Sequence, residues 1–134
     1  MKLDSKTQKR LLDAALAAQK RAYAPYSNYR VGAALLTKSG EIFSGSNIEN
    51  AAYSPSICAE RTAIFKAVSE GFRDFIAIAI AHASGSASCG VCRQVIREFA
   101  PSLQQITIDA KGKIRSFSST DLLPESFGPE DLKK

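Results

Sequence analysis

The sequence is poor in the residues that build disulfide scaffolds and membrane spans. It has three cysteines among 134 residues, an odd number that argues against a disulfide framework and for a reducing compartment. It has no apolar stretch near the roughly 20 residues that a transmembrane helix needs. Its start, Met1-Lys2-Leu3-Asp4, lacks the apolar run of a signal peptide. We therefore expect a cytoplasmic protein without a membrane partner.

Tryptophan is absent, and histidine occurs once, at position 82. The net charge of +5 comes from 18 lysine and arginine residues against 13 acidic ones, and much of the excess lies near the two ends. No platform of interleaved basic and aromatic residues offers nucleic-acid bases a surface for stacking. A solvated basic helix face explains the charge better than a nucleic-acid site does, so we expect no nucleic-acid partner.

The chain carries enough apolar residues for one core. Hydrophobic residues make up 45% of it, and no linker or internal repeat divides it, so we expect a single domain over residues 1–134. Hydrophobic periodicity and turn signals predict helices over 5–24, 56–70 and 89–99, and strands over 31–36, 41–46, 75–81, 106–109 and 114–117. This order predicts an α/β fold, a three-layer αβα sandwich with a mixed five-stranded sheet.

Two side chains are predicted to cap helices. Ser5-Lys6-Thr7-Gln8 has the form of a capping box at the start of the first helix. Ser88 stands directly before the helix predicted over 89–99 and is a candidate for its N-cap.

All three cysteines lie in two short segments, Cys58-Ala59-Glu60 and Cys89-Gly90-Val91-Cys92. Both segments are predicted at helix N-termini, where the helix dipole stabilises thiolates for metal capture. Three protein ligands leave the fourth position of a tetrahedral zinc open, which is typical of a catalytic site. Glu60 is placed to act as the general acid/base of that site. The same layout is found in zinc-dependent nucleobase deaminases.

Three other interpretations of the cysteines stay open. Cys89 and Cys92 could form a redox pair, although this would leave Cys58 and Glu60 unexplained. His82 could be a fourth ligand and make the zinc site structural. All three cysteines could also be inert residues of the core.

The chain resembles the small cytidine deaminases, in the tetrameric branch that uses three cysteines. The resemblance covers nearly the whole sequence. It rests on Pro25-Tyr26-Ser27, on Val31-Gly32-Ala33-Ala34-Leu35, on Asn47-Ile48-Glu49-Asn50-Ala51, on Cys58-Ala59-Glu60-Arg61-Thr62-Ala63, on Cys89-Gly90-Val91-Cys92-Arg93-Gln94, and on Leu122-Leu123-Pro124 with Phe127-Gly128-Pro129-Glu130-Asp131-Leu132.

This resemblance implies hydrolytic deamination of cytidine and 2′-deoxycytidine to the uridines, with release of ammonia, in pyrimidine salvage. It assigns one Zn²⁺ per subunit to Cys58, Cys89 and Cys92, and it makes Glu60 the proton shuttle. Arg61 would hydrogen-bond the zinc-bound sulfurs and withdraw excess negative charge from them. A helix-surface arginine is the simpler alternative.

The resemblance also implies how a nucleoside is held. Asn47 and Glu49 would bind the ribose hydroxyls, and Tyr29 and Ala59 would line the substrate site. Ala51, Tyr53 and Phe127 would reach the substrate of a neighbouring subunit in a homotetramer. From the residues alone, Glu49 could equally be a surface charge and Phe127 a core residue.

Four departures from the family pattern stand near the site. Ser88 stands where the family usually has proline, and Tyr29 stands where it usually has phenylalanine. Ser46 replaces a frequent cysteine, and the stretch 82–88 is shorter than usual. None of them removes a ligand or the glutamate. A polynucleotide deaminase, a deaminase of a cytosine-bearing antibiotic and a non-catalytic zinc module remain as alternative functions.

Overall fold

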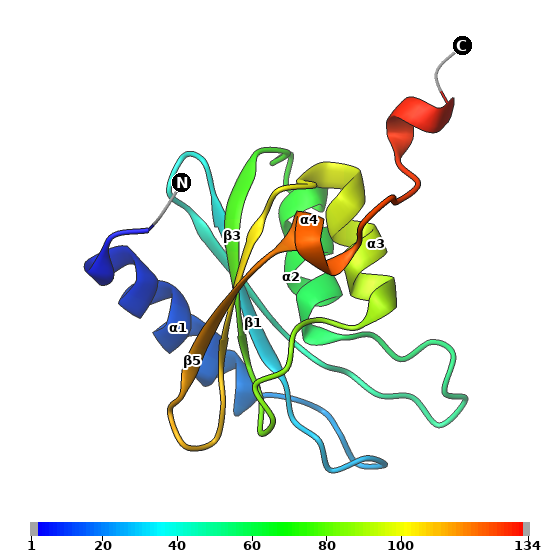
Figure 1. Ribbon diagram of the computed structural model, residues 1–134. Helices are drawn as coiled ribbons and strands as arrows, with labels where there is room; N and C mark the ends of the chain where they lie inside the picture. Colours follow the sequence, from blue (N-terminus) through cyan, green and yellow to red (C-terminus); the bar gives the residue numbers. More distant parts are fainter. Residues whose placement is uncertain (1–2, 133–134) are drawn as a thin grey trace.

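A computed structural model describes residues 3–132, which form one five-stranded sheet with helices on both faces (Figure 1). The strands lie side by side in the order β2-β1-β3-β4-β5. Their bounds are β1 Gly32–Thr37, β2 Ile42–Ser46, β3 Phe75–Ala81, β4 Gln104–Ile108 and β5 Ile114–Ser118. Only the β3–β4 pair is parallel, so the sheet is mixed.

The two faces of the sheet are covered by different helices. The helices are α1 Ser5–Gln19, α2 Ala59–Ser69, α3 Gly90–Phe99, the single turn α4 Ser119–Leu122 and the 3₁₀ turn η1 Pro129–Leu132. Along β1, Ala34 and Leu36 pack under α1, while Ala33 and Leu35 pack under α2 and α3. This alternation follows from the two-residue period of a strand. The prediction of a three-layer αβα sandwich with a mixed sheet is confirmed.

The strand register brings three loops together at one end of the sheet. Gly32, the first residue of β1, pairs with Ser46 at the end of β2 and with Ala81 at the end of β3. The segment before β1, the segment after β2 and the segment after β3 therefore meet at this end. The second of these leads to α2, and the third leads to α3.

Gly45 lets α2 pack closely on β2. A Cβ atom at this position would lie 2.6 Å from the backbone nitrogen of Ala63 and 2.8 Å from the carbonyl oxygen of Ala59. Any side chain here would push the first turns of α2 away from the sheet. The glycine thus fixes where the helix that carries Glu60 begins.

The predicted helix caps are wrong in detail. Asp4, one residue before the predicted capping box, is the N-cap of α1, and its Oδ1 accepts a hydrogen bond of 2.7 Å from the Thr7 N–H. The second helix begins at Ala59, not at position 56, because Ile57 pairs with Ile48 in an isolated β-bridge. None of the helices formed by residues 3–132 has the length and hydropathy that crossing a bilayer requires.

Candidate active site

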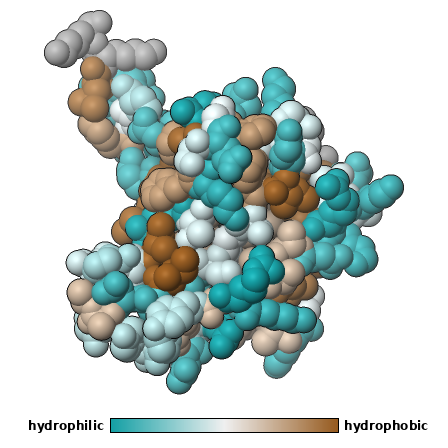
Figure 2. Space-filling view, turned by 180° about the vertical axis from the view of Figure 1, so that it is seen from behind, coloured by the Kyte–Doolittle hydropathy of each residue, from teal (hydrophilic) through white to brown (hydrophobic). Residues whose placement is uncertain are grey.

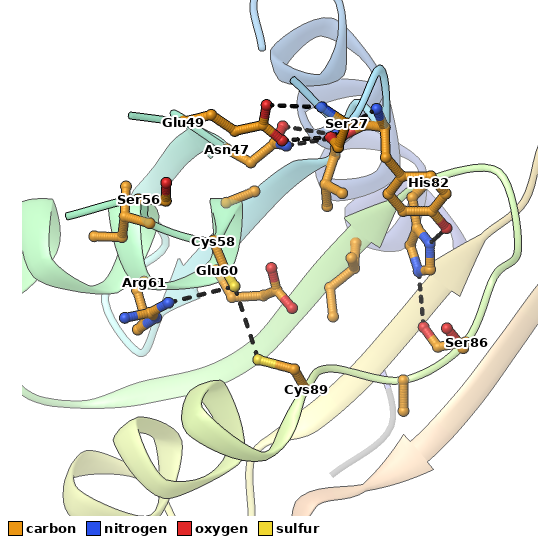
Figure 3. Close-up of a pocket in the computed structure, with 16 residues that line it drawn as sticks. Ser27, Asn47, Glu49, Ser56, Cys58, Glu60, Arg61, His82, Ser86 and Cys89 are labelled. Atoms are coloured by element: carbon orange, nitrogen blue, oxygen red, sulfur yellow. Dashed lines mark hydrogen bonds between the residues drawn. The ribbon is translucent and has the colours of Figure 1, made fainter. Parts of the chain in front are cut away.

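A cavity of about 420 Å³ opens at the end of the sheet where the three loops meet (Figure 3). Its walls come from the segment before β1, the segment after β2, the start of α2, the end of β3 and the segment before α3. The lining residues are Ser27, Tyr29, Val31, Asn47, Glu49, Ser56, Ile57, Cys58, Ala59, Glu60, Arg61, Ile80, His82, Ser86, Ala87 and Cys89.

The structure brings the three cysteines together, although they come from two helix starts. Cys58 and Cys89 are the N-cap residues of α2 and α3, and neither uses its side chain to cap the helix. The sulfurs of Cys58, Cys89 and Cys92 all lie within 4.8 Å of one another, and those of Cys58 and Cys89 are 3.7 Å apart. Two sulfurs bound to one tetrahedral zinc at 2.3 Å would be about 3.8 Å apart. A disulfide would need about 2 Å, so the cluster fits a metal ion.

The cluster holds a thiolate next to a cation. Arg61 Nη2 donates a hydrogen bond of 3.4 Å to Cys58 Sγ. Hydrogen bonding from Cys92, with a smaller effect of Arg61, lowers the pKa of Cys58 to about 5. The pKa of the Cys92 thiol is raised, because this thiol hydrogen-bonds the Cys58 sulfur and is buried. Arg61 therefore faces the sulfurs and is not a free arginine on the helix surface. That it withdraws charge from zinc-bound sulfurs stays a prediction.

Glu60 extends from the first turn of α2 into the cavity, beside Cys58 and Cys89 (Figure 3). Its side chain is buried, with 5% of the residue exposed. Burial raises the pKa of Glu60 to about 7, and the negative charge of Cys58 adds to the rise. A carboxyl group with a pKa near neutrality can both accept and return a proton at physiological pH.

Asn47 and Glu49 lie on the opposite side of the cavity from the sulfurs (Figure 3). Asn47 Oδ1 accepts a hydrogen bond of 2.9 Å from the Val31 N–H, and its Nδ2 donates one of 2.8 Å to the Tyr29 carbonyl. Glu49 Oε1 accepts from the backbone N–H groups of Tyr26 and Ser27. The Ser27 hydroxyl also contacts Glu49 and is the main cause of its lowered pKa. Glu49 is thus an ionised pocket carboxylate.

His82 is not part of the metal cluster. Its Nδ1 lies 2.5 Å from the Tyr29 hydroxyl, and its Nε2 lies 2.8 Å from the Ser86 carbonyl oxygen. Both ring nitrogens are therefore occupied, and the cluster within residues 3–132 contains the cysteines alone. The alternative of a structural site with His82 as fourth ligand fails.

The other residues predicted for substrate binding fall into two groups. Tyr29 and Ala59 line the cavity. Ala51, Tyr53 and Phe127 lie outside it and are exposed, Tyr53 to 75% and Phe127 to 58%. Phe127 is therefore not a core residue.

Ser88 does not cap α3, because the N-cap is Cys89. Instead the Ser88 hydroxyl is buried and donates a hydrogen bond of 2.8 Å to Gln105 Oε1 on β4. Arg93 Nε donates to the Ser88 carbonyl over 2.7 Å. Side-chain and backbone bonds thus anchor the residue that precedes Cys89.

The sequence patterns did not assign Ser27, Ser56 or Ser86 to a cavity wall. Each is a small polar residue in a loop, and such residues are common in any loop. Only the register of β1, β2 and β3 brings the first and last of them to one end of the sheet.

Comparison with known proteins identifies the family. Residues 5–107 match the family model described as the cytidine and deoxycytidylate deaminase zinc-binding region. The chain belongs to this deaminase family. The matched region is zinc-binding and contains the three-cysteine cluster, so zinc is the cofactor of this chain.

Individual relatives agree with this assignment. A cytidine deaminase of Sporosarcina psychrophila is 51% identical over 118 residues, which cover 86% of this chain and 87% of the relative. The crystal structure of a cytidine deaminase from Burkholderia pseudomallei matches with a TM-score of 0.86 and 47% identity, over 89% of this chain and 98% of that chain. A blasticidin-S deaminase of Bacillus cereus is 34% identical over 111 residues, which cover 75% of this chain and 79% of the relative.

Proposed function

We propose that this protein catalyses the hydrolytic deamination of cytidine and 2′-deoxycytidine to uridine and 2′-deoxyuridine, with release of ammonia. The observation that carries the proposal is the buried Glu60 carboxyl group beside the three cysteine sulfurs, in one cavity with Asn47 and Glu49. The names of the more similar relatives support the same activity. We place the reaction in pyrimidine salvage in the cytoplasm, with no nucleic-acid partner.

Cys58, Cys89 and Cys92 would hold one zinc ion per chain. When bound, zinc supplies the Lewis acidity that makes a water molecule more acidic at neutral pH. Arg61 donates a hydrogen bond to Cys58 Sγ, which draws negative charge from the thiolate and keeps the site electrophilic.

Glu60 performs the proton transfers. Its carboxylate removes a proton from the water that attacks C4 of the cytosine ring, and it delivers a proton to N3. It then takes the remaining proton from the hydroxyl group at C4 and passes it to the amino group, which leaves as ammonia while the C4 carbonyl forms. One side chain can serve all these steps because burial raises the pKa of Glu60 to about 7, near neutrality.

A spectrophotometric assay of the purified, zinc-loaded protein tests the proposal. We expect conversion of cytidine and 2′-deoxycytidine and poor conversion of free cytosine, because Asn47 and Glu49 are assigned to the sugar. Blasticidin S is the alternative substrate to include, given the deaminase of Bacillus cereus that acts on it. Turnover of blasticidin S without turnover of cytidine would refute the proposal.

Replacing Glu49 by alanine is expected to raise the KM for cytidine at least tenfold with little change in zinc content. The carboxylate accepts hydrogen bonds from the loop at Tyr26 and Ser27 and, in our proposal, from the ribose hydroxyls. Steady-state kinetics and metal analysis give the two readouts. Glu41→Ala is the matched control, because Glu41 bonds Thr37 and Ser39 at the far end of β1. An unchanged KM would remove Glu49 from the sugar site.

We further propose a homotetramer in which neighbouring subunits complete each active site. The C-terminal segment with η1 projects from the body of the subunit in Figure 1, and it carries the exposed Phe127 and Leu132. Apolar patches are also open on the face seen in Figure 2. Ala51 and Tyr53 lie on the exposed loop between β2 and α2. These side chains gain partners if a second copy covers them.

Phe127→Ala is therefore expected to raise the KM for cytidine about fivefold to 150-fold. The range follows from about 1–3 kcal/mol for the stacking of a base on an aromatic ring. Light scattering at the assay concentration measures the mass, and kinetics measures the KM. An active monomer with a normal KM after this substitution would refute the shared site.

A further inference from the structure

The single histidine of the chain is a buried side chain of the cavity wall that the proposed reaction does not use. His82 directly follows β3, and its backbone N–H donates a hydrogen bond of 3.2 Å to the Ile108 carbonyl on β4. The residue is thus fixed to the sheet by its backbone. Its ring lies edge-on to the ring of Tyr29, with centroids 5.7 Å apart.

The hydrogen bonds of His82 define its tautomer. The Ser86 carbonyl oxygen can only accept, so His82 Nε2 carries the proton and donates over 2.8 Å. Nδ1 is then the acceptor, and the Tyr29 hydroxyl donates its one proton to it over 2.5 Å. Ser84 Oγ lies 3.1 Å from the Tyr29 hydroxyl oxygen and 3.3 Å from Nδ1. The Ser84 N–H also donates to the Tyr29 hydroxyl oxygen, over 3.3 Å. The ring therefore joins Tyr29 to the loop that runs from position 82 to Cys89.

Tyr29 is at the same time joined to the sugar side of the cavity. Its carbonyl accepts from Asn47 Nδ2, and its N–H donates to Ser27 Oγ over 3.0 Å. The Ser27 hydroxyl contacts Glu49. One continuous set of hydrogen bonds thus runs from Asn47 and Glu49 through Tyr29 and His82 to the loop before Cys89.

We propose that His82 is a positioning residue. Through its hydrogen bond with Tyr29, it keeps the loop before Cys89 in a fixed position relative to the sugar side of the cavity. The part that concerns substrate rests on the proposed function, whereas the part that concerns the metal does not. The Tyr29 hydroxyl bonds His82 and Ser84 and does not contact a cysteine. Its removal must nevertheless speed the release of zinc from the three cysteines.

The first test is nuclear magnetic resonance of the one histidine in the zinc-loaded protein. We expect the proton on Nε2 and a hydrogen-bonded, unprotonated Nδ1 in the wild type. In Tyr29→Phe we expect the Nδ1 resonance to move toward that of a nitrogen with a weaker donor, because only Ser84 Oγ, 3.3 Å away, remains. A proton on Nδ1, or an Nδ1 resonance unchanged by Tyr29→Phe, would overturn the inference.

The second test measures zinc release to a chromogenic chelator. Tyr29→Phe is expected to release zinc about tenfold faster than the wild type, because the loop before Cys89 loses its hydrogen bonds to the Tyr29 hydroxyl. Tyr23→Phe is the matched control, because Tyr23 is exposed and its hydroxyl has no described hydrogen bond within residues 3–132. Equal release rates for Tyr29→Phe and wild type would overturn the inference.

A double-mutant cycle isolates the pair. In a His82→Ala background, Tyr29→Phe should have a clearly smaller further effect on zinc release and on kcat/KM for cytidine, because only the bonds between the Tyr29 hydroxyl and Ser84 remain to be lost. His82→Asn should bring the zinc-release rate and kcat/KM part of the way back to the wild-type values, because the asparagine side-chain oxygen can accept a hydrogen bond from Tyr29. Effects that simply multiply would overturn the coupling. If the wild type fails to convert cytidine, the proposed function fails, while the resonance and zinc-release results still decide the role of His82.

Discussion

Replacing Glu60 by glutamine is expected to lower kcat for cytidine by about a hundredfold to ten-thousandfold, the range for loss of a general acid/base. An amide of the same shape cannot accept or return a proton. Zinc content should stay at the wild-type level, because the three sulfurs are untouched. The melting temperature should not fall, because the substitution places a neutral group where burial already disfavours the charged one.

Glu98→Gln is the matched control for this substitution. Glu98 is exposed on α3 and lies outside the cavity, so its variant should keep wild-type kinetics. Steady-state assays, metal analysis and thermal melting provide the three readouts. If Glu60→Gln keeps near wild-type turnover, another group performs the proton transfers and the proposed mechanism is wrong.

The residues of the metal cluster could be predicted from the sequence because each is marked by the residues next to it in the chain. Cys58 and Cys89 each start a helix, and helix starts can be found from the apolar periodicity that follows them. Glu60 lies in the first turn of α2, where its distance from Cys58 is fixed by helix geometry. The structure brings the three sulfurs within 4.8 Å of one another and places Glu60 in the wall of the same cavity.

The hydrogen bonds around the cluster were not accessible in the same way. Ser88 was predicted to cap a helix from its position alone, whereas its hydroxyl bonds Gln105, seventeen residues away on β4. Tyr29 and His82 are 53 residues apart and meet only because β1 and β3 are neighbours in the sheet. Contacts of this kind depend on strand order and register, which turn and periodicity signals do not specify.

The departures from the family pattern acquire a physical meaning in the structure. The hydroxyl of Tyr29 has an acceptor in His82, so it is not an unsatisfied polar group in the cavity wall. The hydroxyl of Ser46 donates to the Ala18 carbonyl near the end of α1. Neither departure disturbs the sulfurs, Glu60 or Arg61.

Removing one sulfur is expected to have the second large effect. Cys92→Ala should reduce zinc from one ion per chain to a small fraction of that and lower turnover at least a hundredfold. Cys92 is fully buried, and its sulfur lies within 4.8 Å of both others, so no other cysteine can take its place. Two remaining sulfurs leave the ion with half of a tetrahedral shell.

Zinc-dependent stability distinguishes loss of the metal site from loss of the fold. Zinc that binds only the folded state adds about 2.7 kcal/mol to the free energy of unfolding at a hundred times its Kd. The melting temperature of chelator-treated wild type should therefore rise when zinc is returned, and turnover should return with it. Cys92→Ala should melt cooperatively, but adding zinc should neither raise its melting temperature nor restore its turnover. If the Cys92→Ala variant binds zinc with wild-type stoichiometry, Cys92 is not a ligand, and Cys58 and Cys89 are the only cysteines that bind the zinc.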